Sequence, residues 1–271
     1  RDLVRSRGLG DVYKRQQMRE AMRQVGFHKV IEVAVGADMC TAEEAEDFLK
    51  KVPEQQPFMA TSCCPSWSVM AKKLFPQFKD YISMAMTPMV LTARLYKKDH
   101  PDVRIVFIGP CTAKKLEASR RTIRSDVDFV LTFEEMQGIF DAKGIVPSEM
   151  PYDPDDEFST GTSLGRGFAV TGGVADAVKK AIAEIDPERE VLVEHADGLR
   201  ECRKMLMMAK AGKYNGYLLE GMGCPGGCVA GAGTITPVKK STAAVTRYVN
   251  EAKVKSVQES AAVKRLREVQ D

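Results

Sequence analysis

Three short cysteine segments lie far apart along the chain and constrain its fold more than any other feature. They occupy residues 61–67 (TSCCPSW), 109–115 (GPCTAKK) and 221–228 (GMGCPGGC), and they hold five of the seven cysteines. Each segment combines thiols with proline or small residues, which allow a backbone to wrap closely around an inorganic centre. We therefore expect a fold that brings the three segments together at one metal site.

Length and composition limit the classes of protein to consider. A chain of 271 residues is long enough for one large domain or two modest domains with a hydrophobic core. It has no run of about 18 consecutive apolar residues, so we expect no membrane span. An odd number of irregularly spaced cysteines disfavours a disulfide scaffold and indicates a reduced, cytoplasmic metal or redox protein.

The net charge of +3 has a local origin. Residues 1–16 carry five of the 40 basic and two of the 37 acidic residues, so the remainder is balanced and gives no indication of nucleic-acid or anionic-membrane binding. Within this stretch, residues 6–16 (SRGLGDVYKRQ) resemble a translated sequencing adapter. We interpret 1–16 as a non-native scar that replaces a longer native N-terminus. A native basic arm is the alternative.

Hydrophobic periodicity and helix signals predict an α/β architecture with mainly parallel sheets. We expect strands at 30–35, 103–108, 129–131, 190–193 and 217–219. We expect helices at 18–25, 41–52, 67–74, 134–142, 174–185 and 199–211, with capping boxes at Thr41/Glu44 and Thr132/Glu135. Residues 151–167 read as a loop, and 251–271 as a charged, solvated helical tail.

Two of the cysteine segments adjoin the ends of predicted elements. The helix that contains Trp67 begins just after Cys63 and Cys64, and the partial positive charge of a helix N-terminus should lower the pKa of these thiols. The strand at 103–108 should deliver Cys111 at its C-terminal end, where open α/β sheets place ligands. Cys40 and Cys202 lie outside the segments, and we expect them to be buried or incidental thiols.

Four thiolates suffice to hold a 4Fe-4S cluster, and such clusters collect ligands from separated loops. Zinc and structural burial of inert cysteines are the alternatives. Zinc ribbons usually use two Cys-x-x-Cys knuckles, whereas this chain has an adjacent pair, a lone cysteine and a Cys-x-x-x-Cys spacing. The spacing favours iron–sulfur.

The three segments resemble, in order and in interval, the three signature motifs of the iron-only, or di-iron, hydrogenases. The resemblance extends over roughly residues 17–250, which would form the catalytic domain. It implies a two-lobed α/β domain with an H-cluster between the lobes. The implied reaction is the reversible interconversion of dihydrogen with protons and electrons.

The resemblance also implies roles for individual cysteines. Cys64, Cys111, Cys224 and Cys228 match the four ligands of the 4Fe-4S half of the H-cluster, with Cys228 bridging to a di-iron half. That half bears carbonyl, cyanide and azadithiolate ligands, which this chain does not make. Cys63 matches the free cysteine that exchanges protons with the azadithiolate bridge.

Further positions match by the same comparison. Lys114 matches the lysine that holds a cyanide ligand, and Met222 matches a methionine packed against the di-iron carbonyls. Counting without gaps places Ser83, Glu43 and Glu46 on the proton relay, and Glu44 replaces Glu43 if a gap lies nearer Cys63. The implied partners are ferredoxin or an accessory iron–sulfur domain or subunit, together with maturation proteins.

The chain also departs from prominent members of the family. It has Gly109 where they have methionine, Met89 where they have glutamine, and Ala232 within the glycine run at 231–233. These features resemble a less studied branch. Two alternatives stay open: a hydrogen sensor with slow turnover, and a nonenzymatic hydrogenase-like iron–sulfur assembly protein without the di-iron unit. Retention of Cys63 and Lys114, and of Met222, disfavours the assembly protein.

Overall fold

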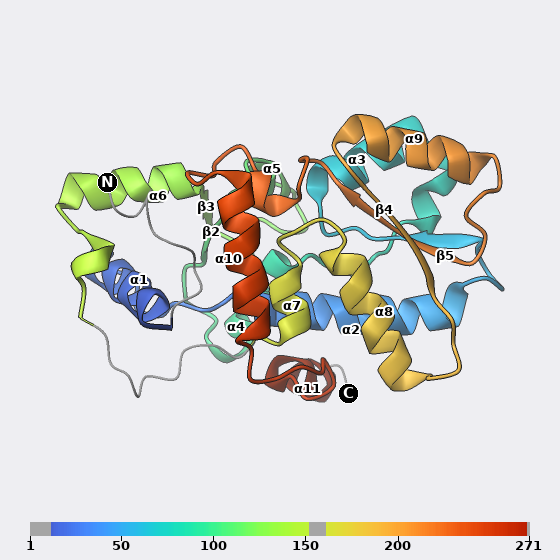
Figure 1. Cartoon of the computed structure of the whole chain (residues 1–271). Helices are drawn as coiled ribbons and strands as arrows, with labels where there is room; N and C mark the ends of the chain where they lie inside the picture. The colour runs from blue at the N-terminus through green and yellow to red at the C-terminus, as the bar shows by residue number, and fades with distance from the viewer. Residues whose placement is uncertain (1–11, 152–160, 270–271) are drawn as a thin grey trace.

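Parallel strands form two sheets in the computed structural model of the chain, which describes residues 12–151 and 161–269 (Figure 1). The larger sheet has the order β1 (Phe58–Ala60), β5 (Tyr217–Met222), β4 (Leu192–Asp197). The smaller sheet pairs β2 (Val106–Ile108) with β3 (Phe129–Leu131). Every ladder between these strands is parallel. The α/β architecture with mainly parallel sheets is therefore confirmed.

Helices connect the strands. The α-helices are α1 (Val12–Val25), α2 (Ala34–Lys51), α3 (Pro65–Leu74), α4 (Pro88–Asp99), α5 (Ala113–Ala118), α6 (Phe133–Lys143), α7 (Ser163–Gly167), α8 (Gly173–Ile185), α9 (Leu199–Lys210), α10 (Val238–Asn250) and α11 (Ala261–Glu268). Short 3-10 turns are η1 (Pro76–Tyr81), η2 (Pro147–Glu149) and η3 (Cys228–Ala230). Within the described ranges, no helix is both long and apolar enough to cross a membrane.

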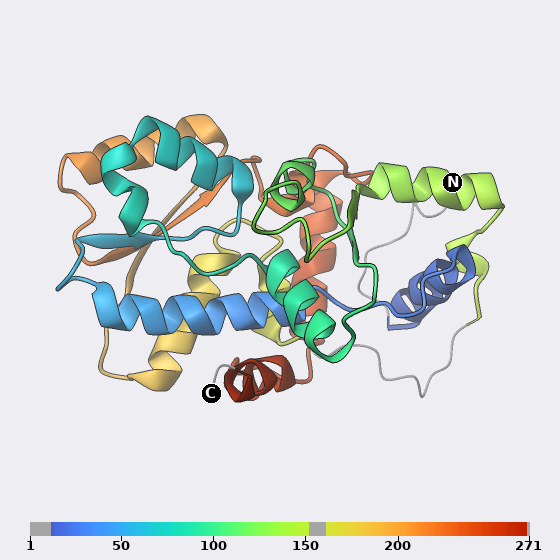
Figure 2. The same ribbon diagram turned by 180° about the vertical axis from the view of Figure 1, so that it is seen from behind.

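The larger sheet is covered by helices on both faces (Figures 1 and 2). Because strand side chains alternate between faces, Phe58 and Leu219 point into a core shared with α3 and α9. Met59 and Leu218 point the other way, into a core shared with α2 and α8. Burial on both faces explains why these strands are apolar without alternation.

The smaller sheet organises the second lobe. Ile108 and Leu131 pack with α1 and α6, around Phe140. Phe107 and Val130 pack with α4 on the other side. The strand at 129–131 and the capping box at Thr132/Glu135 are confirmed, since Thr132 Oγ1 accepts from the Glu135 N–H and the Glu135 side chain accepts from the Thr132 N–H.

The strand expected at 30–35 is wrong, because α2 already begins at Ala34. Tertiary packing overrides the β-rich composition of this stretch: α2 crosses α4 so closely that a β-carbon on Gly36 would lie 2.1 Å from the Pro88 carbonyl oxygen. The capping box expected at Thr41 is also wrong. Thr41 lies inside α2, and its hydroxyl donates to the Ala37 carbonyl at 2.8 Å.

The polar segment before α8 is more structured than expected, and the tail is more buried than expected. Thr162 caps α7 inside the predicted loop 151–167, of which 152–160 lie outside the described residues. The solvated helix expected over 251–271 is wrong: within the described residues 251–269 only α11 is helical, and Val257 and Val263 are fully buried against the body of the protein. Ser260 donates to the buried Asp38 carboxylate of α2, which fixes the tail to the core.

The proposed scar at 1–16 stays a prediction. Residues 1–11 lie outside the described residues, and 12–16 form the start of α1. The helix expected at 18–25 is confirmed, and Gly26 ends it with φ 123°.

Candidate metal centre

The first cysteine segment links β1 to α3. Cys64 is the N-cap of α3, Pro65 occupies its first turn, and the segment is anchored by Trp67, whose Nε1 donates to the Thr61 carbonyl at 2.9 Å. The backbone of Gly221 lies directly against the Trp67 ring, where a β-carbon would be 2.2 Å from Cδ2. Trp67 is therefore a buried anchor that holds the first and third segments together.

The third segment follows β5, the central strand of the larger sheet. Gly227 has φ 90°, and a β-carbon there would lie 2.7 Å from the Thr171 backbone nitrogen, so this turn requires glycine. Asp197, at the end of β4, accepts from the Gly226 N–H at 2.8 Å and from the Thr171 hydroxyl at 2.9 Å. A carboxylate thus holds the loop between Cys224 and Cys228 in place.

The second segment comes from the other lobe. Cys111 follows β2 and precedes α5, which places it at the C-terminal end of a parallel strand, as predicted. The segment meets the third one directly: the Gly233 N–H donates to the Pro110 carbonyl at 2.9 Å. A β-carbon on Gly231 would lie 2.3 Å from the same oxygen.

The structure brings the four predicted ligand cysteines together. The Gly223 N–H donates to Cys64 Sγ at 3.3 Å, which joins the first and third segments. Burial and then the neighbouring thiols of Cys64 and Cys111 raise the pKa of Cys228 to about 12. The same causes raise the pKa of Cys224. The four thiols therefore share one electrostatic environment between the lobes.

This donor set fits an iron–sulfur cluster. Four crowded, half-buried thiols are costly as thiolates unless a cationic centre compensates their charge, and thiolates are the ligands that hold a 4Fe-4S cluster. Among the described residues, no three His, Cys, Asp or Glu side chains approach closely enough to bind a single metal ion. A cubane takes its thiolates at four separate corners.

Lys114 points inward, toward the first segment. Its ammonium donates to the Cys63 carbonyl at 3.2 Å and to Glu117 Oε2 at 2.7 Å. Both charged side chains are buried, Lys114 with 8% and Glu117 with 3% of its surface exposed. Lys114 is therefore not an ordinary surface lysine, and its ammonium lies beside Cys63 while paired with Glu117.

Met222 is the last residue of β5 and is also buried at the site. It belongs to a cluster against which Cys63, Cys64 and Cys228 pack. Its carbonyl accepts from the Cys202 thiol at 3.3 Å. Cys202 and Cys40 are both fully buried, in agreement with their prediction as buried thiols.

Cys63 does not have the lowered pKa that a helix N-terminus predicts. Burial, followed by the negative charges of Glu44 and Cys228, raises the pKa of the Cys63 thiol well above its usual value. Desolvation therefore outweighs the helix dipole, whose effect is limited to the first turn.

The predicted relay residues are distributed unevenly. Ser83 is buried, and its hydroxyl accepts from the Ala85 N–H at 3.1 Å. Glu44 is fully buried in α2, where Oε1 accepts from the Ser62 N–H at 3.3 Å. Glu43 is half-buried, and Glu46 is exposed and ion-paired with Arg267 at 3.0 Å. The structure therefore brings Ser83 and Glu44 to the Cys63 segment, whereas Glu46 lies at the surface.

Glu44 has the environment of a proton-transfer group. Burial raises the pKa of Glu44 to about 7, an effect opposed by the Ser83 hydroxyl and the Ser62 amide. Its Oε2 has no hydrogen-bond partner among the described residues. A carboxyl group with a pKa near neutrality exchanges protons readily in both directions.

Comparison with known proteins identifies the family. The sequence profile described as "Iron only hydrogenase large subunit, C-terminal domain" matches residues 4–232. The chain belongs to this family. Within it, the chain is 29% identical over 258 residues to Iron hydrogenase 1 from Clostridium pasteurianum, covering 79% of this chain and 44% of that protein. It is 27% identical over 264 residues to Cytosolic iron-sulfur assembly component 3 from Rattus norvegicus, covering 79% of this chain and 55% of that protein.

Solved structures confirm the fold of the iron-only hydrogenase domain. An apo variant of the [FeFe]-hydrogenase HydA1 from Chlamydomonas reinhardtii superposes with a TM-score of 0.75 at 24% identity, covering 93% of this chain and 82% of that one. The chain spans about half the length of the curated relatives named above.

Two departures from prominent iron-only hydrogenases meet at one side chain. A β-carbon on Gly109 would lie 2.8 Å from the Phe107 ring, so Phe107 occupies the space that a side chain at 109 would take. Phe107 in turn packs against the cluster that contains the buried Met89. The apolar Met89 and the missing side chain at 109 are therefore parts of one local arrangement.

The third departure has a simple steric explanation. Gly231 and Gly233 are buried, and a β-carbon on Gly233 would lie 2.4 Å from the Thr132 β-carbon. Ala232 between them is exposed. The run therefore needs glycine at its ends but not at its centre.

Sequence reasoning missed three carboxylates that position the site. Glu117 pairs with Lys114, Asp197 holds the loop after Cys224, and the buried Glu220 of β5 accepts from the Gly172 and Ala175 N–H groups at the start of α8. The i, i+3 spacing of Lys114 and Glu117 was a signal for the first. Asp197 and Glu220 accept from backbone amides that are distant in sequence, and no local sequence pattern predicts such contacts.

Proposed function

We propose that this chain catalyses the reversible interconversion of dihydrogen with protons and electrons at an H-cluster. The observation that carries the proposal is the convergence of four thiols from two lobes with Cys63, Lys114 and Met222 around them. Each of these side chains has a role at a two-part cluster. A simple structural metal site would not need Cys63, Lys114 and Met222 in addition to the four thiols.

Cys64, Cys111, Cys224 and Cys228 would hold the 4Fe-4S half, with Cys228 bridging to the di-iron half and its carbonyl, cyanide and azadithiolate ligands. When bound, the H-cluster supplies the redox change and the iron at which dihydrogen is split. The Lys114 ammonium would donate to an anionic cyanide ligand, as a charge-assisted hydrogen bond in a water-poor site. Met222 would exclude water by packing beside the same unit.

Proton movement would run through the protein along Cys63, Glu44 and Ser83. The Cys63 Sγ–H bond breaks as the proton passes toward the Glu44 carboxylate, which leaves a thiolate. The reverse transfer protonates the thiolate again. The pKa of about 7 at Glu44 suits a group that accepts and returns a proton at neutral pH. We therefore assign the relay carboxyl to Glu44, with Glu43 as the alternative and Glu46 as a surface group.

The proposed setting follows from this chemistry. The protein would act in the cytoplasm and exchange electrons with ferredoxin or with an accessory iron–sulfur domain or subunit. Maturation proteins would supply the di-iron unit, because the chain itself makes none of its ligands.

A second candidate is a nonenzymatic iron–sulfur assembly role. It is favoured by the relative named Cytosolic iron-sulfur assembly component 3, whose identity of 27% is close to the 29% of Iron hydrogenase 1. The inward placement of Lys114 beside Cys63 supports the hydrogenase instead, since both residues serve the di-iron unit in that proposal.

The experiment is anaerobic reconstitution with iron, sulfide and the di-iron cofactor, followed by infrared spectroscopy and a dihydrogen assay. We expect carbonyl and cyanide bands and dihydrogen evolution, and a protein that holds a cubane but never shows such bands is an assembly-type protein. The Cys63→Ala variant should keep its bands and lose about 100-fold or more in turnover, while the Cys202→Ala control keeps both. Unchanged turnover in Cys63→Ala would contradict the proton route.

A further inference from the structure

Three polar side chains follow one another across the larger sheet, on the face that α2 and α8 cover. In the parallel register, His195 of β4 lies beside Glu220 of β5. Thr61 continues β1 beside Glu220, since its N–H donates to the Leu219 carbonyl at 2.9 Å. Residues in register point to the same face, and neighbouring strands are about 4.8 Å apart. These three residues form the Thr61–Glu220–His195 row.

The row leads from the candidate site to the surface. Thr61 and Glu220 are fully buried, and so is Glu44 of α2, whose Oε1 accepts from the N–H of Ser62, next to Thr61. At the other end, His195 is exposed on β4, the outer strand of this sheet. Groups that exchange protons therefore extend from the proposed relay carboxyl to solvent.

The start of α8 holds Glu220 and His195 together. Glu220 accepts from the Gly172 N–H and from the Ala175 N–H, each at 2.8 Å. A β-carbon on Gly172 would lie 3.9 Å from the His195 ring, so the imidazole lies over the same glycine. Each carboxylate oxygen has a second lone pair, so Glu220 still has room to take a proton.

Capping of α8 accounts for Glu220 but not for two other polar atoms near the row. Thr61 Oγ1 and Glu44 Oε2 are buried and have no hydrogen-bond partner among the described residues. Buried polar atoms normally find a partner, and an ordered water molecule often supplies it. One water molecule between Glu44 and Thr61 would satisfy both atoms and join the relay to the row.

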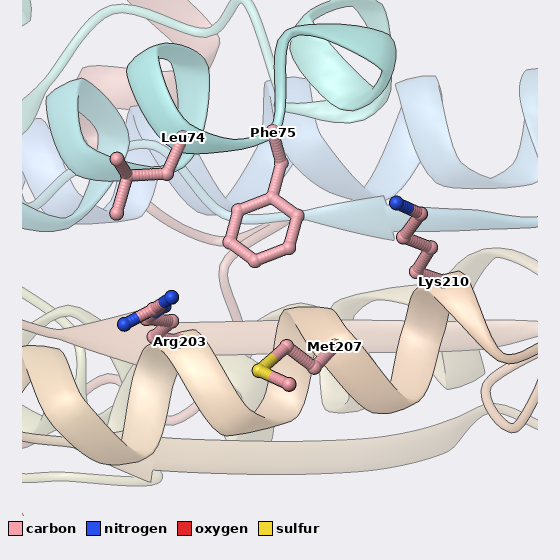
Figure 3. A pocket seen from close by; sticks show the side chains of 5 residues that line it. All are labelled: Leu74, Phe75, Arg203, Met207 and Lys210. Carbon is pink, nitrogen blue, oxygen red and sulfur yellow. The ribbon is translucent and has the colours of Figure 1, made fainter.

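The opposite face of the sheet has no comparable row within the described residues. One residue earlier, the strands present Ala60, Leu219 and Glu194 in register, and the first two are apolar. The groove outside the helices of that face is lined by Leu74, Phe75, Arg203, Met207 and Lys210 (Figure 3). Arginine and lysine side chains donate hydrogen bonds but do not accept them. The polar row is therefore a feature of the α2–α8 face.

We propose that the Thr61–Glu220–His195 row conducts protons between Glu44 and solvent. This inference rests on the proposed function and gives its proton route a surface end. In dihydrogen uptake, the Glu44 O–H bond breaks, its proton passes through the bridging water to Thr61 Oγ1, and Thr61 releases its own proton to Glu220. Glu220 then protonates the His195 imidazole, which gives the proton to water. Every bond to hydrogen that breaks is replaced by one that forms, so no electrons are needed, and dihydrogen evolution reverses the steps.

Exchange of the Cys63 thiol proton for deuterium tests the row in the metal-free protein. The S–H stretching band of Cys63 is identified by its loss in Cys63→Ala, and its decay is followed by infrared spectroscopy after transfer to D2O. Thr61→Val removes a hydroxyl without a partner, so the free energy of unfolding should not fall, yet exchange should slow at least about tenfold. Thr61→Ser should restore the rate. The control Thr87→Val removes another buried, unpartnered hydroxyl outside the row and should exchange like the wild type.

Chemical rescue tests the surface end of the row. In the reconstituted protein, His195→Ala should evolve dihydrogen from reduced methyl viologen about tenfold more slowly, and added imidazole should restore the rate. The control His100→Ala removes another exposed histidine and should alter neither the rate nor the response to imidazole. Unchanged turnover in His195→Ala, or a loss that imidazole does not restore, overturns the proposal.

The two measurements separate the row from the proposed function. Slow exchange in Thr61→Val and normal exchange in Thr61→Ser, in a protein that never evolves dihydrogen, support the row and contradict the hydrogenase. The comparison is repeated in the Ser83→Ala background, because the Ser83 hydroxyl also faces Glu44. Wild-type exchange in folded Thr61→Val, with Thr61→Val/Ser83→Ala no slower than Ser83→Ala, overturns the row and leaves the proposed function standing.

Discussion

The Lys114 ammonium donates to the backbone carbonyl of Cys63 at 3.2 Å and so ties the second cysteine segment to the first across the two lobes. The same ammonium forms a buried ion pair with Glu117 at 2.7 Å. One lysine thus connects the lobes and neutralises a carboxylate at the place where they meet.

Removing this lysine should destabilise the protein through Glu117. In Lys114→Met the Glu117 carboxylate is left buried without its cation, which should lower the free energy of unfolding by about 3 kcal/mol. In Lys114→Met/Glu117→Gln the buried charge is gone, and most of the loss should be recovered. Urea unfolding of the metal-free proteins measures both. Equal midpoints for the single and double variants would contradict the ion pair as the cause.

Glu44 should make stability depend on pH. Its pKa of about 7 in the folded protein exceeds its ordinary value of 4.5, so the folded state binds a proton more tightly than the unfolded state. The free energy of unfolding should therefore fall as pH rises from about 4.5 to about 7, by up to roughly 1.4 kcal/mol per pH unit, and stay level above that window. The charged groups that face Glu44 include Glu43 and Glu220, which add to this effect.

The Glu44→Gln variant isolates this contribution because its amide does not titrate. Asp38, whose pKa burial raises to about 6, is present in both proteins and cancels in the difference. Thermal unfolding of the metal-free chain between pH 5 and pH 8 provides the comparison. Parallel curves for Glu44→Gln and wild type would rule out a raised pKa of Glu44 in the folded protein.

Asp197 should determine how well the third cysteine segment retains iron. Asp197→Ala leaves the Gly226 N–H and the Thr171 hydroxyl without their acceptor. This should destabilise the ordered conformation of the loop by roughly 1–2 kcal/mol. We expect about tenfold weaker retention of iron during titration with a chelator, with little change in helix content. Asp176→Ala on the exposed face of α8 is the control, and equal retention by both variants would exclude Asp197 from positioning the loop.

The glycine run gives a prediction with a built-in control. Gly231→Ala places a β-carbon 2.3 Å from the Pro110 carbonyl oxygen and should separate the second and third segments at a cost of about 1–3 kcal/mol. Ala232→Gly changes an exposed position and should alter the unfolding free energy by less than about 1 kcal/mol. Chemical denaturation of both variants measures the two free energies of unfolding. An unchanged value for Gly231→Ala would contradict the close approach of Gly231 to the Pro110 carbonyl oxygen.

The parts of this fold that local signals encode could be predicted from the sequence. The capping box at Thr132/Glu135 and the strand before it are confirmed because all their interactions lie within a few residues. The start of α2 was missed because Gly36 is helical through its contact with Pro88, which is distant in sequence. The buried tail was missed for the same reason, since Ser260 is held by Asp38.

The candidate site divides in the same way. The composition of the three cysteine segments predicted that they converge, and the family resemblance implied Cys64, Cys111, Cys224 and Cys228 as ligands; these four thiols do lie together. Counting residues back from Cys63 could not decide which glutamate of α2 faces the site. The structure decides it, because Glu44 is buried and Glu46 is exposed.

The pairing of β1 with β5 has a consequence for how the protein is made. Phe58 lies beside Tyr217 and Ala60 beside Leu219, so the strand that precedes Cys64 has no neighbour in the larger sheet until β5 has been synthesised. At about 5–20 residues per second, the ribosome needs roughly 10–30 s to extend the chain from β1 to β5. The thiols of the first segment are without Cys224 and Cys228 during that time. Insertion of the proposed cluster would therefore follow synthesis of the third segment and the slow closure of a contact between distant segments.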